Sequence, residues 1–311
     1  MANRFFAALM LWCALVAPAD TAQPEVLKRG DVAIIYEPGM KSAALEVLGS
    51  IPSIRKHIEE RTGLTVDFRF DVVVFRNRDD FVRQAGNDMI AAFAVPGEGR
   101  IVLDLSQMSV HPLNIELISM HEMTHLVLHH NIERANLPKW FDEGISEWVS
   151  GISEIINPEK TNALKKAVIG NKLIPLYRLR HSFPDTRDGF LLAYQQSRSI
   201  VEFIERKYGE HALQGIMGRL SNGEGFNDAV RHELSEIVTE IEREWKSSLR
   251  TQYTWLGYVS NNIQWIVFVA AALITTIGFL RLRKRIRDYP DDEEDEYLEN
   301  ILREDVHDDT K

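Results

Sequence analysis

The segment Trp255–Leu280 sets the strongest constraint on how this chain can fold. It holds no Asp, Glu, Lys or Arg in 26 consecutive positions. Its core, Ile263–Leu280, would measure about 27 Å as a helix, close to the ~30 Å of hydrocarbon in a bilayer. A basic block, Arg281–Arg287, comes directly after it, which is typical of a membrane span rather than of a buried core helix. We therefore predict a transmembrane helix over residues 256–280.

The charges around this segment predict its orientation. The block Arg281–Arg287 carries five basic residues in seven, whereas the nearest basic residues before the segment are Lys246 and Arg250. Short basic flanks stay on the cytoplasmic side of a membrane. Residues 281–311 are therefore expected to form a cytoplasmic tail, basic at first and then acidic, with 7 basic and 12 acidic side chains. Such a charge run is typical of a solvated, disordered tail.

The N-terminus has the pattern of a secretory signal peptide. Arg4 precedes the apolar run Phe5–Val16, and Ala17-Pro18-Ala19 supplies a cleavage site, so residues 1–19 are expected to be removed. The alternative, an uncleaved anchor, is disfavoured because the run is short for a bilayer. The single cysteine, Cys13, lies in this segment, so the mature chain would form no intrachain disulfide.

These features predict a location. We expect a single-pass protein of a bacterial inner membrane, with residues 20–253 as a periplasmic or otherwise extracytoplasmic domain and the C-terminus cytoplasmic. A net charge of −10 argues against a nucleic-acid partner, because proteins that bind nucleic acids carry a basic surface.

The exported domain shows strand patterns first and helical patterns afterwards. We expect strands over Asp31–Tyr36 and Thr65–Phe75, a hairpin, and two helices, the first of which is broken or offset at Pro52. The hairpin covers Ile90–Val95 and Arg100–Leu105, and the helices cover Ser42–Arg61 and Asp79–Ala85 with Asp79 as cap. From Asn114 onward the pattern is helical. The sequence therefore predicts an α+β fold, with an N-terminal mixed sheet and its helices, then the helix from Asn114 and a C-terminal helical bundle.

The predicted helix Asn114–His130 contains His121-Glu122-Met123-Thr124-His125. Residues four apart lie about 40° apart on a helix, so His121 and His125 can present two imidazoles to one metal ion. Glu122 would lie close enough to an open coordination position to take a proton from bound water. The alternative is a pair of unrelated surface histidines. Zinc needs a third protein ligand, so a suitable residue later in the chain decides between the two.

The segment Leu137–Trp148 supplies such a residue. In it Trp140, Glu143, Gly144 and Trp148 form a W-x-x-E-G-x-x-x-aromatic pattern, with 17 residues between His125 and Glu143. With both motifs the chain resembles the gluzincin metallopeptidases, the peptidase MA-like families. The resemblance implies a zincin-like fold, a Zn²⁺ ion held by His121, His125 and Glu143, and Glu122 as general base.

The same resemblance implies two further roles. Glu147, one turn after Glu143, would orient a ligand histidine through a hydrogen bond without touching the metal, and the alternative is a solvated helix glutamate. Tyr194 would open a helix behind the metal site and donate a hydrogen bond to the developing oxyanion, and the alternative is a tyrosine that packs in the core. The strand Arg100–Leu105 would border the cleft. His129 and His130 are expected to be exposed or to cap the helix.

These observations favour a membrane-anchored, exported zinc metallopeptidase that hydrolyses peptide bonds in a peptide or protein substrate. The alternative is a catalytically silent zincin-like module for binding or assembly at the membrane. An intramembrane protease is disfavoured because the motif lies more than a hundred residues before the predicted span.

Overall fold

A computed structural model describes residues 23–86, 88–106, 114–152 and 161–287, together with residues 297, 299 and 301. The predicted signal peptide, Cys13 and nearly all of the predicted acidic tail lie outside the described residues. The chain divides into two compact units, residues 1–250 and residues 251–311, and each is described by itself.

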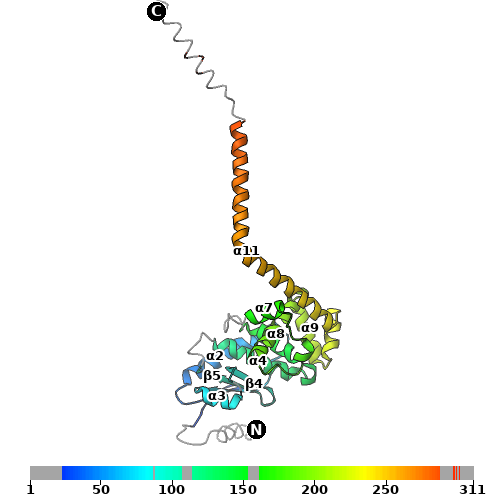
Figure 1. The fold of residues 1–311 in the computed structure, drawn as a ribbon. Coiled ribbons are helices and arrows are strands. Elements are labelled where there is room, and N and C mark those ends of the chain that lie inside the picture. The colour runs from blue at the N-terminus through cyan, green and yellow to red at the C-terminus, as the bar shows by residue number, and fades with distance from the viewer. Residues whose placement is uncertain are drawn as a thin grey trace, which may run out of the picture. The chain divides into compact units, whose positions relative to one another are not determined.

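The first unit begins with a five-stranded mixed sheet in the order β1-β2-β3-β5-β4 (Figure 1). The strands β2 (Val32–Tyr36), β3 (Phe70–Phe75) and β5 (Arg100–Asp104) run parallel, and β1 (Glu25–Arg29) and β4 (Ala92–Val95) pair antiparallel on the two sides. The central strands are nearly continuous apolar runs because both of their faces are buried. The segment before Phe70, which we predicted as strand from Thr65, is irregular.

The strand β5 lies inside the sheet, whereas the expected place of Arg100–Leu105 beside the cleft would put it at an edge. The strand β5 pairs with β3 on one side and β4 on the other, so β4 forms the edge of the described sheet. The turn between them is a short 3₁₀ helix, η1 (Pro96–Glu98), closed by Gly99 at a φ of 60°. The interior strand β5 has four of its five residues buried, compared with one of the four in β4.

Two helices flank the strands. The helix α2 (Lys41–Thr62) runs through Pro52 without a break, contrary to our prediction. A proline inside a helix costs about 3 kcal/mol, but Ile51 and Ile54 are buried on either side of it, and their packing keeps the helix continuous. The helix α3 (Arg78–Ala85) begins one residue earlier than predicted, because the side chain of Asn77 accepts the capping bond.

The remainder of the first unit is helical, which confirms the predicted α+β fold, with the sheet and its two helices first and a helical part after them. Short 3₁₀ turns, η2 (Arg134–Asn136) and η4 (Leu176–Leu179), connect some of these helices. The helices are α4 (Ile115–Asn131), α5 (Lys139–Ser150), α7 (Thr161–Ile169), α8 (Arg187–Tyr208), α9 (Glu210–Ser221), α10 (Phe226–Leu234) and the start of α11 (Val238–Arg287).

The helices α5 and α8 cross at Gly144. A β-carbon at this position would lie 2.4 Å from the backbone oxygen of Ser197 and 2.7 Å from Cγ2 of Val201. Distances this short are repulsive, so only glycine allows the two backbones to approach so closely. The glycine of the W-x-x-E-G pattern therefore sets the distance between the two helices.

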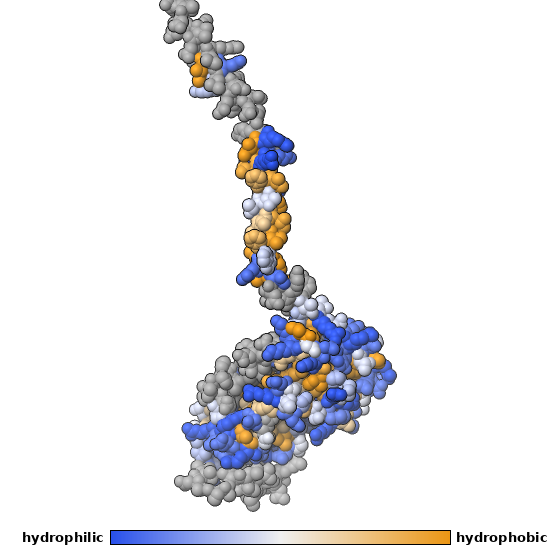
Figure 2. All heavy atoms as spheres, viewed as in Figure 1, coloured by the Kyte–Doolittle hydropathy of each residue, from blue (hydrophilic) through white to orange (hydrophobic). Residues whose placement is uncertain are grey.

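The second unit contains one described segment, Asn262–Arg287 of α11, that is long and apolar enough to cross a membrane. Large apolar side chains such as Ile274 and Phe268 are exposed on it. Figure 2 shows much of this helical segment in orange, the colour of hydrophobic residues. This candidate span starts six residues after the predicted one and includes the basic block at its end.

Replacing Gly144 with alanine should destabilise the first unit by about 1–3 kcal/mol, because the methyl group overpacks the α5–α8 crossing. The measurement is the thermal midpoint of the purified protein. Gly218 in α9 is the matched control, since no heavy atom lies within 4 Å of a β-carbon built there. Gly218→Ala should be neutral or slightly stabilising. Equal midpoints for the two variants would show that the crossing does not need glycine.

Candidate metal centre

The helix α4 carries the His-Glu-x-x-His motif through the core. The side chain of Asn114 caps its first turn by accepting a hydrogen bond from the backbone of Glu116 at 2.9 Å. Its central residues, from Ile118 to Leu128, are buried almost all round. A helix buried on every face is expected to be apolar, so the buried His121 and Glu122 indicate a functional site.

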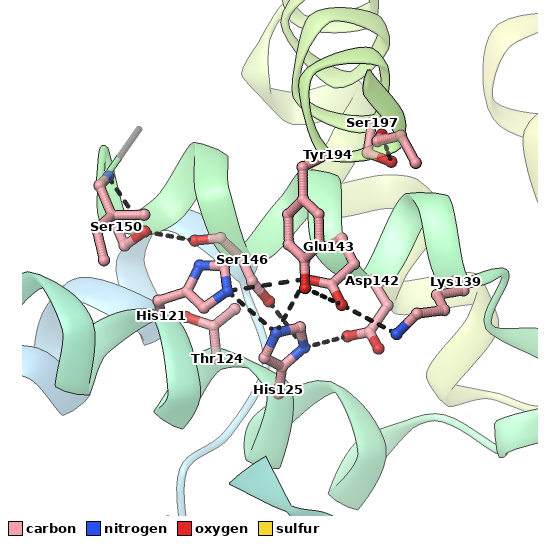
Figure 3. Close-up of polar contacts among 12 residues, drawn as sticks. His121, Thr124, His125, Lys139, Asp142, Glu143, Ser146, Ser150, Tyr194 and Ser197 are labelled. Carbon is pink, nitrogen blue, oxygen red and sulfur yellow. Dashed lines mark hydrogen bonds and ion pairs between the residues drawn. The ribbon is translucent and has the colours of Figure 1, made fainter. Parts of the chain in front are cut away.

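Three side chains converge at one point between α4 and α5 (Figure 3). The Nε2 atoms of His121 and His125 lie 3.3 Å apart, and Oε2 of Glu143 lies 3.8 Å and 3.4 Å from them, respectively. Tetrahedral ligands at the zinc distance of about 2.0–2.1 Å are separated by about 3.3–3.5 Å. The triangle therefore has the size that a small divalent cation requires, and the structure brings together the three predicted ligands.

The two oxygens of Glu143 have different surroundings. Its Oε1 accepts hydrogen bonds from Nζ of Lys139 at 3.0 Å and from the hydroxyl of Tyr194 at 3.1 Å. Its Oε2 is buried and has no hydrogen-bond donor among the described residues. A buried carboxylate oxygen without a partner is costly. A cation inside the triangle would remove that cost, so the donor set fits a metal ion.

The two histidines differ in charge when no cation is present. Burial, together with the neighbouring His125, lowers the pKa of His121 to about 4, which keeps its imidazole neutral. Burial also lowers the pKa of His125, but the carboxylates of Asp142 and Glu143 outweigh it and hold that pKa well above its ordinary value. Because ligand imidazoles must be neutral, a bound cation would take the place of this proton.

Asp142 on α5 orients the second histidine. Its Oδ1 lies 2.7 Å from Nδ1 of His125, and its Oδ2 lies 3.0 Å from Nε2 of His129. Burial raises the pKa of Asp142, but the two imidazoles outweigh it and lower that pKa below its usual range. The hydroxyl of Ser146 is also 3.2 Å from His125 Nδ1. The Nδ1 atom therefore carries the hydrogen, which leaves Nε2 of His125 facing the triangle.

Sequence reasoning missed Asp142, Lys139 and Ser146, and its prediction for His129 was wrong. His129 is mostly buried and bonds to Asp142, whereas His130 is exposed as expected. A signal for His129 was present, because it lies four residues after His125 and so on the same face of α4. No comparable signal marks Asp142, since its contact depends on how α4 and α5 are oriented.

Glu122 lies beside the triangle and against the sheet. Its carboxylate is buried and is held by a backbone hydrogen bond from Ala94 of the edge strand β4. Burial, reinforced by the charges of Glu143 and Asp142, raises the pKa of Glu122 to about 7. A carboxylate with this proton affinity can accept a proton from water and release it again.

Tyr194 reaches the site from α8. Its hydroxyl donates to Glu143 Oε1, and its ring packs against Phe183 and Phe190 at centroid distances of 5.2 Å and 4.8 Å. Burial and the charge of Glu143 raise its pKa well above 10, so the phenol stays a donor. The residue lies about two turns inside α8 and does not open the helix as predicted, because Thr186 provides the cap.

Glu147 is buried one turn after Glu143 on α5. Its charge contributes to the raised pKa of Tyr194, which places it near the phenol. Asp142 and Ser146 lie within hydrogen-bond distance of His125 Nδ1. The expected role of Glu147 in orienting a ligand histidine stays a prediction.

Part of the chain is similar to a known protein family and to a curated protein. Residues 108–251 match the family model of the Peptidase MA superfamily. A curated Bacillus subtilis (strain 168) protein, named uncharacterized protein YhcO, is 21% identical over 193 residues, which cover 57% of this chain and 56% of that protein.

Similar solved structures include an M1 zinc metallopeptidase from Deinococcus radiodurans, with a TM-score of 0.43 and 14% identity over 74% of this chain and 50% of that one. Yeast LTA4 hydrolase in complex with Bestatin has a TM-score of 0.44 and 14% identity over 71% of this chain and 37% of that one. The chain thus spans about half the length, or less, of these two structures.

Glu143→Ala should remove most of the bound zinc, because two imidazoles alone leave the cation without a charged ligand. Glu147→Ala should weaken zinc binding by about 10–100-fold at most if Glu147 only orients a ligand. Metal content after dialysis, measured by atomic emission, separates the two variants. Full occupancy in Glu143→Ala would exclude it as a ligand.

Proposed function

We propose that this chain, whose residues 108–251 match the family model of the Peptidase MA superfamily, is an exported, membrane-anchored zinc metallopeptidase. The observation that carries the proposal is the buried triangle of His121, His125 and Glu143, which has zinc-like dimensions and an oxygen without a donor among the described residues. Glu122 is the neighbour of His121 in the chain. Zinc held in the triangle would polarise the peptide carbonyl and lower the pKa of a water molecule.

Glu122 supplies the proton transfers in this proposal. Its carboxylate takes a proton from the attacking water and passes it to the leaving amine, so one residue serves as base and then as acid. The backbone N–H of Ala94 fixes the carboxylate between the triangle and the strand β4. Burial excludes bulk water from this carboxylate, which keeps the proton on the reaction path.

Tyr194 and Lys139 have different roles beside Glu143 in this proposal. Both donate to Oε1 of this carboxylate. When a substrate is present, the phenol of Tyr194 can turn to the carbonyl oxygen and stabilise the charge that develops there. Lys139 then still holds Oε1, so the ligand carboxylate stays in place. The raised pKa of Tyr194 keeps its proton available for this hydrogen bond.

The edge strand β4 offers a place for an extended substrate. Within the described sheet it pairs with β5 alone, so its outer side can bond to a peptide backbone. Backbone pairing gives affinity with little dependence on the substrate sequence. Because Ala94 of the same strand holds Glu122, a peptide aligned along β4 would pass close to the general base.

The membrane topology is the second part of the proposal. The segment Asn262–Arg287 is apolar and exposed, and its basic residues lie at its C-terminal end. This charge distribution favours a cytoplasmic C-terminus and an extracytoplasmic peptidase domain. The signal-peptide pattern of residues 1–19 agrees with it.

Glu122→Gln should retain zinc at near wild-type levels and lose most hydrolysis, because an amide cannot accept the proton. Cleavage of a peptide library by metal-loaded wild-type and variant proteins provides the measurement. Equal cleavage by both would exclude Glu122 as the base. Zinc binding by the wild type without any cleavage would instead favour a silent binding or assembly module.

Tyr194→Phe deletes only the hydroxyl and keeps the ring against Phe183 and Phe190. We expect kcat to fall on the order of 10²–10³-fold, with KM and the thermal midpoint little changed, because the lost bond acts on the transition state. Steady-state kinetics on a cleaved peptide test this. Activity within a few-fold of the wild type would make Tyr194 a packing residue.

Topology is tested with reporter fusions. A reporter enzyme that is active only outside the cytosol should be active when it is fused after Asp20 or placed within the first unit. The same reporter should be inactive when it is fused after Lys311. A cytosolic reporter should give the opposite result. Digestion of the tail by protease added to intact cells would contradict the proposed orientation and indicate the opposite one.

A further inference from the structure

We propose that His129 is a positioning residue for the metal centre, which acts through Asp142 on the orientation of His125. The inference rests on the proposed metal site, but it concerns a residue outside the ligand set. Its basis is the arrangement in which one carboxylate of α5 is held between two imidazoles of α4.

The two bonds to Asp142 use different oxygens. Oδ1 accepts a hydrogen bond from Nδ1 of His125 at 2.7 Å, and Oδ2 accepts one from Nε2 of His129 at 3.0 Å. Asp142 is buried, and only 20% of the His129 side chain is exposed. His125 and His129 are one helical turn apart, so the carboxylate lies against two successive imidazoles on one face of α4.

A single hydrogen bond would not fix this carboxylate. The terminal torsion of an aspartate side chain has broad, weakly defined minima, so Asp142 bound only to His125 can rotate. The bond from His129 to the other oxygen sets the plane of the carboxylate. The plane of the carboxylate in turn sets the orientation of the His125 ring, because the hydrogen on Nδ1 points to Oδ1 of Asp142. The Nε2 atom on the opposite side of the ring then points into the triangle.

The position of His129 also excludes two other roles. Its Nε2 is bonded to Asp142, and the three residues that form the triangle do not include it, so it is not a fourth ligand in this arrangement. Nor is it an exposed residue at the helix end like His130, because only 20% of its side chain is exposed. The ring of His130 stacks on Phe68 at a centroid distance of 4.5 Å, away from the bonds that hold Asp142.

The test uses the full-length protein in detergent and a chelator competition that gives the zinc dissociation constant. His129→Leu should weaken zinc binding by about 10–100-fold. It should also change the visible spectrum of the Co²⁺-substituted protein, because the geometry of His125 is released. His129→Gln, whose amide N–H can replace Nε2, should restore both to within a few-fold of the wild type. His130→Leu is the matched control and should change neither.

Each result bears on the proposal in one direction. Wild-type zinc affinity and an unchanged Co²⁺ spectrum in His129→Leu would overturn the role of His129 and leave the metal site intact. A wild-type protein that binds neither ion would overturn the metal site itself. If His129→Leu does not fold, the zinc affinities of His129→Asn and His129→Gln are compared instead. The asparagine side chain is too short to reach Asp142, so only His129→Gln should keep the wild-type affinity. Equal affinities of these two variants would also overturn the role.

Discussion

The buried carboxylate of Glu143, facing two imidazoles across the α4–α5 contact, is the interaction on which the rest of the site depends. Bringing this charge into the core is unfavourable unless a cation or hydrogen-bond donors meet it. Lys139 and Tyr194 meet one of its oxygens, and the other faces His121 and His125. The fold supplies this arrangement through a helix buried on all sides and a glycine crossing at Gly144.

The surrounding charges show why a cation suits this position. Glu122, Asp142, Glu143 and Glu147 are all buried on α4 and α5, the two helices that carry the triangle. Against these carboxylates, Lys139 contributes one positive charge through its ion pair with Glu143. The same carboxylates, Asp142 and Glu143, raise the pKa of His125 and so favour positive charge at this point. Because a ligand that binds only the folded state stabilises it, a zinc ion bound at the triangle should stabilise the first unit.

The parts of the site that depend on local geometry could be predicted from the sequence. His121, Glu122 and His125 belong to one helix, whose predicted range of Asn114–His130 differs by one residue at each end from α4. Glu143 could be added because the W-x-x-E-G pattern resembles that of the gluzincins, and the structure places its carboxylate at the two imidazoles.

The remaining features depend on tertiary packing, which a sequence pattern does not encode. The contact of Asp142 with His125 and His129 exists only because α5 turns that face toward α4. The edge position of β4 depends on which strand of the hairpin is more deeply buried. In the same way, the continuity of α2 through Pro52 reflects packing on both sides of the proline, which outweighs its local cost.

The most direct test of the metal centre is an anomalous-scattering map at the zinc edge from crystals of the zinc-loaded protein. We expect one strong peak about 2.0–2.2 Å from Nε2 of His121, Nε2 of His125 and one oxygen of Glu143. Tyr194 and Asp142 should remain outside the coordination sphere. A peak bound by Glu147 or Asp142 in place of Glu143, or no peak between α4 and α5, would contradict the proposed ligand set.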